Sequence, residues 1–274
     1  MQSSSNLQHL GQESSSPLFS VVSIAYNDYK NLLITYKSVI DQTCKDYEWL
    51  VVDGGSKDET PAFLSQLTMN QFSYVSEKDR GLFDAMNKGI GMAKGKYIIF
   101  MNAGDCFASP DILQRVSSEI EKNKSKSYDF IYGDADEVNE EGRLFFRKAR
   151  PFWRLVLGMH THHQAMFYKT SIILENNILY DLKYNVAADY DFTVRFVKRS
   201  KDILYMPIEI CIFLQGGLSH QKWKLALAQM QDSRKKYYKL SIFSLCVIYV
   251  LQYILQTIRF NFAPLYTAYR FKKK

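Results

Sequence analysis

Two aspartates stand where the sequence could do chemistry, each directly after an apolar run. Asp53 ends the run YEWLVVD before the turn GGS, and Asp105 closes the turn NAGD after the run KYIIFM. A carboxylate at the end of a strand can accept a hydrogen bond from a base or ribose, or hold a hard divalent cation. Gly, Asn and Asp are also ordinary turn formers, so each motif alone favours a turn or a helix cap.

The elements that must position these aspartates alternate between strand and helix from Leu18 onward. Apolar runs predict strands at 18–25, 47–53, 72–77 and 96–101, and helical spacing predicts helices at 31–42 and 81–95. Another helix should begin at Ser56 or Asp58 as its N-cap, and the helix at 81–95 should close on Gly95. This order predicts an α/β fold with a mainly parallel sheet and helices on both faces. The turns at 26–28, 53–58, 77–81 and 102–105 should then meet at the carboxyl edge, where ligands bind.

The second half of the chain is less regular. It predicts a strand pair at 128–139 and 142–150, a strand around 162–170, a helix at 187–199 and an extended segment at 203–214. From Gln221 the pattern is helical nearly to the end. We therefore divide the chain into a Ser-rich, disordered lead-in (1–17), an α/β domain (18–220) and a basic, apolar helical region (221–274).

Composition narrows the functional classes. The 274 residues carry a net charge of +7, which favours anionic partners such as nucleotides, nucleic acid or an anionic membrane face. The basic residues are concentrated near the C-terminus rather than along a reading helix, which argues against nucleic acid. The four cysteines show no CxxC spacing, and the N-terminus has no apolar signal region, so a cytoplasmic location is expected. The string of glycines at 89, 91 and 95 lies within or at the end of a predicted helix, so it is not a dinucleotide fingerprint.

Several separate motifs together resemble one known family. The segments SVVSIAYNDYKNL, VVDGGSKDET, KGIGMAKGKYIIFMNAGD and AADYDFTVR occur in the order and spacing of family 2 glycosyltransferases, which adopt the GT-A fold. The segment SEKDRGLFDAMNKGI is similar to the bacterial subgroup that builds exopolysaccharide, O-antigen and colanic-acid-type glycans. The resemblance covers about residues 18–220. It implies a hexosyl or N-acetylhexosaminyl transferase that uses a nucleotide-sugar donor, a UDP-sugar in most members, and a glycan or lipid-linked acceptor.

The resemblance also implies residues for the donor. Carried over to this chain, Tyr26 packs against the uracil base, Asp53 hydrogen-bonds it, and Asp28 and Arg80 line the nucleotide, where a guanidinium suits a diphosphate. The same residues could also occur without a ligand, with Tyr26 as an aromatic side chain at the edge of the sheet and Asp53 as part of a Gly-rich turn.

The metal motif departs from the family pattern. The family's DxD or DxDD positions read Asn102, Ala103, Gly104 and Asp105, so a single carboxylate remains. A hard cation can be held by one or two carboxylates plus substrate phosphates, so Asp105 is expected to hold Mg²⁺ or Mn²⁺ against the diphosphate, with Asn102 assisting. His220, on a loop with paired glycines, is a second candidate metal ligand, as some GT-A enzymes add a C-terminal His.

The segment AADYDF matches the family's catalytic ED segment. Ala188 replaces the Glu, and Asp189 matches the Asp that acts as general base of an inverting displacement. Asp191 is a second catalytic candidate, but it lies about 200° around the helix from Asp189, so we assign it a helix contact beside the base. If the other motifs were absent, both aspartates would be interpreted as ordinary acidic residues of the first helical turn, where the helix dipole favours negative charge. His163 is expected on the acceptor side.

Two further interpretations stay open. Loss of the metal-motif carboxylate and of the Glu at Ala188 could mark a catalytically decayed GT-A domain that binds glycans or partners. Joint retention of Asp53, Asp105 and Asp189 argues against decay. A sugar-nucleotide pyrophosphorylase would need a Gly-rich basic loop after the first strand, where this chain has AYNDYKN.

The stretch 241–258 is strongly apolar, with amides at Gln252 and Gln256 and positive charge on both flanks. It is short for a membrane span, and its flanks fit a helix lying in the cytoplasmic interface at the inner face of the cell membrane. The alternative, a helix packed on the core or in an oligomer interface, is nearly as well supported.

Overall fold

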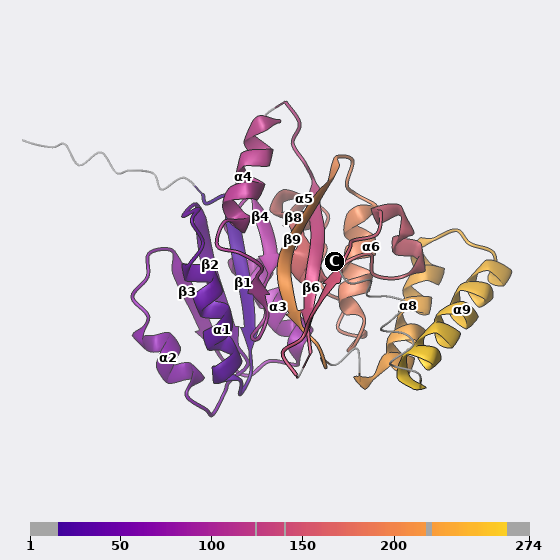
Figure 1. Cartoon of the computed structure of the whole chain (residues 1–274), viewed down its shortest axis with the longest axis horizontal. Coiled ribbons are helices and arrows are strands. Elements are labelled where there is room, and N and C mark those ends of the chain that lie inside the picture. Colours follow the sequence, from indigo (N-terminus) through magenta and orange to yellow (C-terminus); the bar gives the residue numbers. More distant parts are fainter. Residues whose placement is uncertain (1–15, 124, 140, 218–220, 262–274) are drawn as a thin grey trace, which may run out of the picture.

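The computed structural model describes residues 16–123, 125–139, 141–217 and 221–261. Within them, one nine-stranded sheet runs through the molecule in the order β3-β2-β1-β4-β8-β6-β9-β5, with β7 paired to β6 (Figure 1). The predicted lead-in lies almost wholly outside the described residues, as does His220. The α/β prediction is confirmed, and the sheet is mixed.

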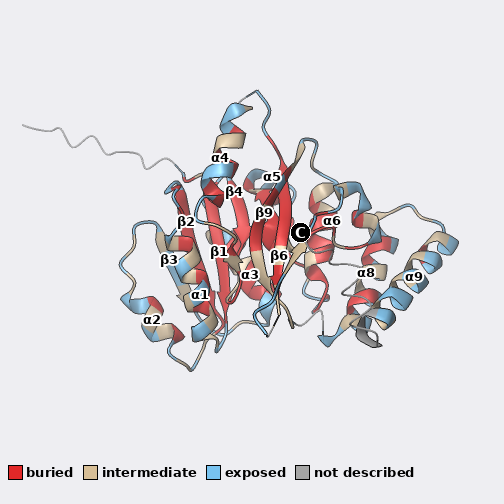
Figure 2. Cartoon of the chain, viewed as in Figure 1, coloured by how far each residue is buried: buried red, intermediate tan, exposed pale blue. Residues whose placement is uncertain are grey.

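The first half of the sheet follows the predicted alternation. Four neighbouring strands pair in parallel, β1 (Phe19–Ala25), β2 (Tyr47–Asp53), β3 (Phe72–Ser76) and β4 (Tyr97–Phe100). Three helices connect them, α1 (Tyr29–Ile40), α2 (Thr60–Gln66) and α3 (Leu82–Met92). Every residue of β1, β2 and β4 is buried, because helices cover both faces of this part of the sheet (Figure 2).

The two faces have separate cores. Val21, Val51 and Ile99 pack with α1, α2 and with α4 (Ile112–Lys122) on one face. Val22, Val52 and Phe100 pack on the other face with α3, α5 (Thr170–Glu175) and α6 (Ala188–Val197). Adjacent residues of one strand thus serve opposite layers, as the period of two requires.

The second half of the sheet pairs in both directions. Its strands are β5 (Cys106–Phe107), β6 (Phe130–Val138), β7 (Leu144–Arg147), β8 (Met166–Lys169) and β9 (Ile203–Leu214). The predicted pairing of 128–139 with 142–150 is confirmed as the antiparallel pair β6–β7. The predicted strand around 162–170 starts late, because a 3₁₀ turn, η2 (His163–Ala165), precedes β8. A second 3₁₀ turn, η1 (Phe152–Leu157), follows β7.

Two helix boundaries differ from the sequence prediction. Helix α2 begins at Thr60 rather than at Ser56 or Asp58, and the Asp58 carboxylate instead accepts hydrogen bonds from the backbone N–H groups of Thr60 and Tyr29. Helix α3 ends at Met92, before Gly95. Gly95 allows its backbone to lie close to that of β1, because a Cβ at this position would lie 2.5 Å from the backbone nitrogen of Ser20.

The C-terminal region forms two helices, α8 (Trp223–Tyr237) and α9 (Ile242–Asn261). Helix α8 packs on α6, and α9 packs on the outer side of α8 (Figure 1). Leu155 of η1 shares a small core with Tyr190 and Val194 of α6, against which Met230 of α8 packs. No helix within the described ranges has both the length and the apolarity needed to cross a membrane.

Candidate active site

Parallel pairing brings the ends of the first strands together. In register, Ala25 lies beside Asp53, and Asp53 lies beside Ser76. The turns that follow are tied to one another, since the Asn27 N–H donates to Ser56 Oγ at 2.7 Å and the Lys57 N–H donates to Asn27 Oδ1 at 2.8 Å. The turn after β4 joins them through the Ala103 N–H and the Ile24 carbonyl. The predicted convergence of the turns is confirmed.

Asp53 is fully buried at this edge and its carboxylate is held from two sides. The hydroxyl and the backbone N–H of Ser56 donate to it, and the Ser76 hydroxyl donates to Oδ2 at 2.5 Å. Since both hydroxyls can rotate away, a ligand N–H can take the place of either one at this carboxylate.

Gly54 follows Asp53 directly, and two side chains of this edge approach it closely. A Cβ on Gly54 would meet Asp79 Oδ2 at 2.5 Å and the Tyr26 ring at 3.2 Å, so these two side chains flank the position. Tyr26 is 63% exposed, which leaves its ring open to stacking. Tyr26, Gly54 and Asp79 thus lie together next to Asp53.

The two other residues predicted to bind the nucleotide, Asp28 and Arg80, also lie at this edge of the sheet. Each of them contacts another side chain of the protein. Asp28 precedes α1, is half-buried and accepts a hydrogen bond from the Asn31 amide at 3.1 Å. The Arg80 guanidinium is 77% exposed and pairs with Asp84 at 2.7 Å, in the first turn of α3. Only one N–H group of the guanidinium is used in this pair, so its other donors could contact a diphosphate.

Asn102, His163 and Asp189 form a row at the carboxyl end of β4. Asn102 Nδ2 lies 3.5 Å from His163 Nε2, and His163 Nδ1 lies 3.9 Å from Asp189 Oδ2. Burial lowers the pKa of His163 to about 3, so the imidazole is neutral at physiological pH. The placement of the Asn102 amide nitrogen beside Nε2 is compatible with the tautomer that carries its proton on Nδ1, on the side of the carboxylate.

Asp189 lies in the first turn of α6 and its side chain is 24% exposed. Oδ1 accepts the N–H of Tyr190 at 2.8 Å, while the 3.9 Å separation from His163 leaves Oδ2 without a hydrogen bond from that ring. Burial raises the pKa of the Asp189 carboxyl to about 6. A partly exposed carboxylate with a pKa close to working pH has the properties of a general base.

Asp191 faces the opposite way from Asp189. It is fully buried, with Oδ2 accepting from Arg195 Nε at 2.7 Å and Oδ1 accepting from Ser233 Oγ at 2.9 Å. These contacts tie α6 to α8. The arrangement agrees with the assignment of Asp191 to a helix contact beside the base.

Asp105 is buried beneath the turn rather than open at the edge. Its two carboxylate oxygens accept hydrogen bonds from Gln164 Nε2 at 2.6 Å and from the Leu214 N–H at 3.2 Å. Burial raises the pKa of the Asp105 carboxyl to about 7, although both hydrogen bonds lower it. Asp105 therefore joins the turn to η2 and to the end of β9.

Few protein atoms at this edge are available to bind a divalent cation. The buried Asn102 Oδ1 has no hydrogen-bond partner among the described residues, and an amide oxygen is a suitable ligand for a hard cation. In the same part of the chain, no three His, Cys, Asp or Glu side chains are arranged to hold a metal ion. A cation here would depend mainly on phosphate oxygens of a donor.

Sequence reasoning missed four polar side chains of this edge: Ser76, Asp79, Gln164 and the hydroxyl of Ser56 as a partner of Asp53. Three of them lie in or next to turns that were expected at the edge, so their positions carried a usable signal. Gln164 carried none, because its role depends on the packing of η2 against the turn at Asp105.

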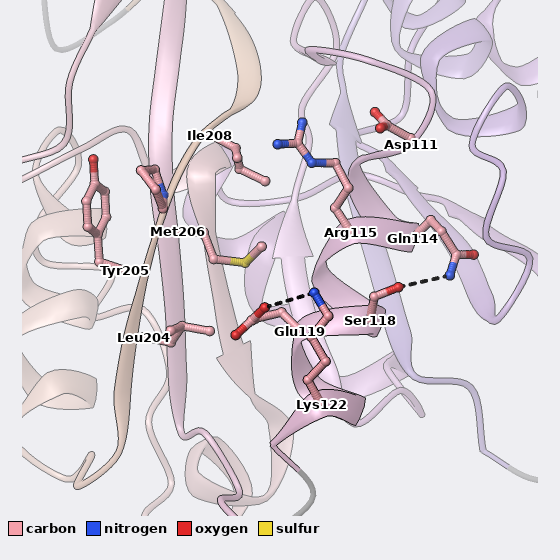
Figure 3. A pocket seen from close by; sticks show the side chains of 11 residues that line it. Asp111, Gln114, Arg115, Ser118, Glu119, Lys122, Leu204, Tyr205, Met206 and Ile208 are labelled. Atoms are coloured by element: carbon pink, nitrogen blue, oxygen red, sulfur yellow. Dashed lines mark hydrogen bonds and ion pairs between the residues drawn. The ribbon is translucent and has the colours of Figure 1, made fainter.

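A groove on the described surface lies away from these residues. A hollow of about 460 Å³ separates α4 from the first half of β9 and is lined by Arg115, Ser118, Leu204 and Met206 (Figure 3). None of the predicted site residues lines it, and it borders the amino-terminal half of β9. Volume alone therefore does not mark the chemistry of this molecule.

Comparison with known proteins agrees with this geometry. The sequence model of the family "Glycosyl transferase family 2" matches residues 20–185. A PGL/p-HBAD biosynthesis glycosyltransferase of Mycobacterium bovis is 31% identical over 209 residues, which span 74% of this chain and 80% of that protein. An uncharacterized glycosyltransferase of Mycobacterium tuberculosis is 32% identical over 233 residues, which span 81% and 86%.

Solved structures share the fold. TarS of S. aureus in complex with UDP-GlcNAc superposes with a TM-score of 0.65 at 17% identity, over 89% of this chain and 74% of that one. The mannosyltransferase PcManGT of Pyrobaculum calidifontis, in complex with GDP-Man and Mn²⁺, gives a TM-score of 0.62 at 15% identity, over 83% and 66%. At these identities the likeness shows the GT-A fold alone.

Proposed function

Because the chain belongs to glycosyl transferase family 2, we propose that it transfers a hexosyl or N-acetylhexosaminyl group from a UDP-sugar, with inversion, to a glycan or lipid-linked acceptor. The observation that carries this proposal is the position of Asp189, a partly exposed carboxylate with a raised pKa beside the converging strand ends. The proposed setting is surface polysaccharide synthesis.

The donor would lie across the edges of β1 and β2. Uracil presents an imide N–H, which Asp53 can accept when a serine hydroxyl rotates away, and Tyr26 can stack on the ring. The absence of a side chain at Gly54 gives the nucleoside its closest approach. The TarS complexes with UDP and UDP-GlcNAc support a uridine donor by analogy of fold.

Asp189 would supply the base. As the acceptor oxygen attacks the anomeric carbon, its proton passes to Asp189 Oδ2, and the bond from the anomeric carbon to the diphosphate oxygen breaks on the opposite face. The neutral His163 leaves Oδ2 available and adds no positive charge that would lower the basicity of Asp189. One displacement without a covalent intermediate inverts the anomeric centre.

A divalent cation, Mg²⁺ or Mn²⁺, would neutralise the leaving diphosphate, and Asn102 and Asp105 are the side chains that would hold it. For Asp105 this requires exchange of a protein hydrogen bond, whereas Asn102 Oδ1 is free to accept. The Mn²⁺ in the PcManGT complex supports a cation by analogy of fold.

The test is calorimetric binding of UDP-Glc, UDP-Gal, UDP-GlcNAc and GDP-Man, with and without Mn²⁺, followed by an assay of nucleotide release. We expect a UDP-sugar to bind and to turn over. Asn102→Ala and Asp105→Asn should weaken the Mn²⁺-dependent part of binding. Binding without turnover, even with glycan acceptors present, would favour the decayed domain instead, and no binding of any donor would refute the proposal.

We also propose peripheral contact with an anionic membrane through 241–258. No charged residue occurs from Ile242 to Ile258, and α9 exposes Ile242, Phe243, Val247, Val250, Leu251, Ile254, Leu255 and Ile258. Next to α9, η1 exposes Trp153 and Leu157, and the Gln252 amide donates to the Leu157 carbonyl. Exposed basic residues at 235, 236 and 239 suit an anionic surface beside this apolar face.

The membrane proposal is tested with vesicles of phosphatidylcholine alone or mixed with phosphatidylglycerol. The full chain should sediment with the anionic vesicles, and Phe243→Glu combined with Val250→Glu should abolish this. Leu174→Glu, on an equally exposed leucine of α5, is the matched control and should bind as wild type. Equal sedimentation of all three proteins would rule out this surface.

A further inference from the structure

Helix α8 lies outside the matched family segment, yet its side chains hold the chain just before Asp189. We infer that Gln229 of α8 is a positioning residue for the Asp189 carboxylate, so that the C-terminal region forms part of the active site. The inference rests on the proposed role of Asp189 as base. It concerns residues beyond 220, which the sequence assigns to a separate region.

The amide of Gln229 binds the chain at three points. Gln229 Oε1 accepts the backbone N–H groups of Val186 and Ala187, each at 3.0 Å, and Nε2 donates to Asn185 Oδ1 at 2.8 Å. One side chain thus uses its acceptor twice and its donor once on three consecutive residues. Asp189 follows two residues later.

Two backbone N–H groups at the start of α6 need an acceptor from elsewhere in the chain. They belong to Val186 and to the N-cap residue Ala187, which are both buried and lie ahead of the first helical turn. Buried N–H groups without an acceptor are costly, so the start of α6 depends on a residue from elsewhere. Gln229 supplies that acceptor, and it fixes where the first turn of α6, and with it Asp189, begins.

Neighbouring residues of α8 hold the same segment on both sides. Asp232 accepts from the Tyr184 hydroxyl at 2.5 Å, and Ser233 donates to Asp191. Positions 229, 232 and 233 lie on one face of the helix, as spacings of three and four require. The segment from Tyr184 to Asp191 is therefore fixed before and after the base.

Helix α8 is in turn anchored by a buried arginine. Arg234 is fully buried, and its guanidinium donates to the Val156 carbonyl at 2.8 Å and to Gln252 at 2.7 Å, and faces the Tyr190 ring at 5.4 Å. The register of α8 along α6 is set by these contacts. Gln229 lies on the same helix, so its hydrogen bonds couple the position of α8 to that of Asp189.

The variants are chosen to separate positioning from general stability. Gln229→Ala removes the acceptor, whereas Gln229→Glu keeps oxygens that can accept both N–H groups. Gln114→Ala makes the same change at an exposed position of α4 and serves as the control. All are made in the full chain. Two measurements are taken: hydrogen–deuterium exchange of residues 184–191, and kcat and KM for the UDP-sugar that the wild type turns over.

We expect faster exchange at 184–191 and a kcat lowered about tenfold or more in Gln229→Ala, with KM for the donor unchanged, since a base displaced by about 1 Å loses rate rather than donor affinity. Gln229→Glu should recover most of both, and Gln114→Ala should match wild type. Unchanged exchange, an unchanged kcat, or a donor KM that changes as much as kcat would overturn the inference. If the wild type turns over no donor, the proposed function fails, while exchange at 184–191 still decides whether Gln229 fixes the segment.

Discussion

His163 Nδ1 lies 3.9 Å from Asp189 Oδ2, and the ring is neutral because burial lowers its pKa to about 3. The pair is therefore a neutral imidazole beside a carboxylate, without an ion pair that would hold Asp189 in its charged form. This relation explains why burial, unopposed by a nearby cation, raises the pKa of Asp189.

Asp189→Asn should separate binding from transfer. The substitution keeps the shape of the side chain and leaves Asp53 and Tyr26 untouched, so donor affinity should stay at the wild-type value. Transfer should fall by roughly 10²–10⁴, the contribution of a general base. Calorimetry and an initial-rate assay measure the two quantities, and wild-type turnover in this variant would falsify the assignment.

Asp191→Asn should act on stability instead. It weakens the contacts of a buried carboxylate to Arg195 and Ser233, at a cost of about 1–3 kcal/mol in unfolding free energy. Thermal denaturation should show a lower Tm than for Asp189→Asn. A variant of normal stability that binds donor but does not transfer would mean that Asp191, and not Asp189, is the base.

The rate should depend on pH through Asp189. A base works when ionised, and its pKa is about 6 in the ligand-free protein, so kcat/KM should reach a plateau above about pH 7 and fall tenfold per unit well below pH 6. This acid limb should vanish from the residual rate of Asp189→Asn. A limb that persists unchanged in that variant belongs to another group.

Asp105 should contribute to stability in a way that weakens as pH rises toward neutrality. Its pKa of about 7 in the folded protein lies above the ordinary value of 3.8, so between about pH 4 and 7 the folded state binds more protons than the unfolded chain. Its contribution to the unfolding free energy then decreases with pH across this window, by up to about 1.4 kcal/mol per unit. His160 and His163, whose pKa values burial lowers to about 3, contribute a change of opposite sign up to about pH 6.5, so Asp105 is measured by the difference between two proteins. Urea titrations at pH 4.5 and 7.5 should show that the unfolding free energy changes less favourably with rising pH in the wild type than in Asp105→Asn. Asp189 adds a decrease of the same sign up to about pH 6, which the variant retains.

Gly54→Ala should impair the donor site through shape. The new methyl group would approach Asp79 Oδ2 and the Tyr26 ring, which must shift away from the position above Asp53. We expect a raised donor KM with a Tm near the wild-type value. Gly91→Ala is the control, since nothing lies within 4 Å of its Cβ and the change in α3 should stabilise by about 0.5–1 kcal/mol. Equal donor KM in both variants would count against the nucleoside position.

Strand ends were the part of the site that could be predicted from sequence. Asp53 and the NAGD turn follow apolar runs, and parallel pairing brings such ends together whatever the details of packing. Helical spacing predicted that Asp189 and Asp191 face different ways, and the resemblance of AADYDF to the family's ED segment selected Asp189. Their opposite surroundings in α6 agree with the spacing argument. The roles of all these residues stay predictions until the variants are measured.

What sequence could not supply depends on contacts between distant segments. Nothing in NAGD indicates that Asp105 turns inward to Gln164 and Leu214, because both partners come from elements more than 50 residues away. Gln229 is an unremarkable polar residue in a helical pattern until α8 is placed against α6. The late start of α2 follows from an Asp58 side chain shared with Tyr29, another long-range contact.

The two halves of the sheet are joined by a short ladder between β4 and β8. Strand β4 pairs with β1 over four residues but with β8 over only two, Tyr97 with Lys169 and Ile98 with Tyr168. Tyr26 and Asp53 lie on one side of this junction, His163 and Asp189 lie on the other, and Asn102 follows β4 itself. The backbone ladder between the two halves is therefore short, and the cores on both faces of the sheet, which contain residues of both halves, supply the rest of the connection. If the proposed roles hold, the distance between the nucleoside site and the base is set across this short ladder and by the packing of these two cores.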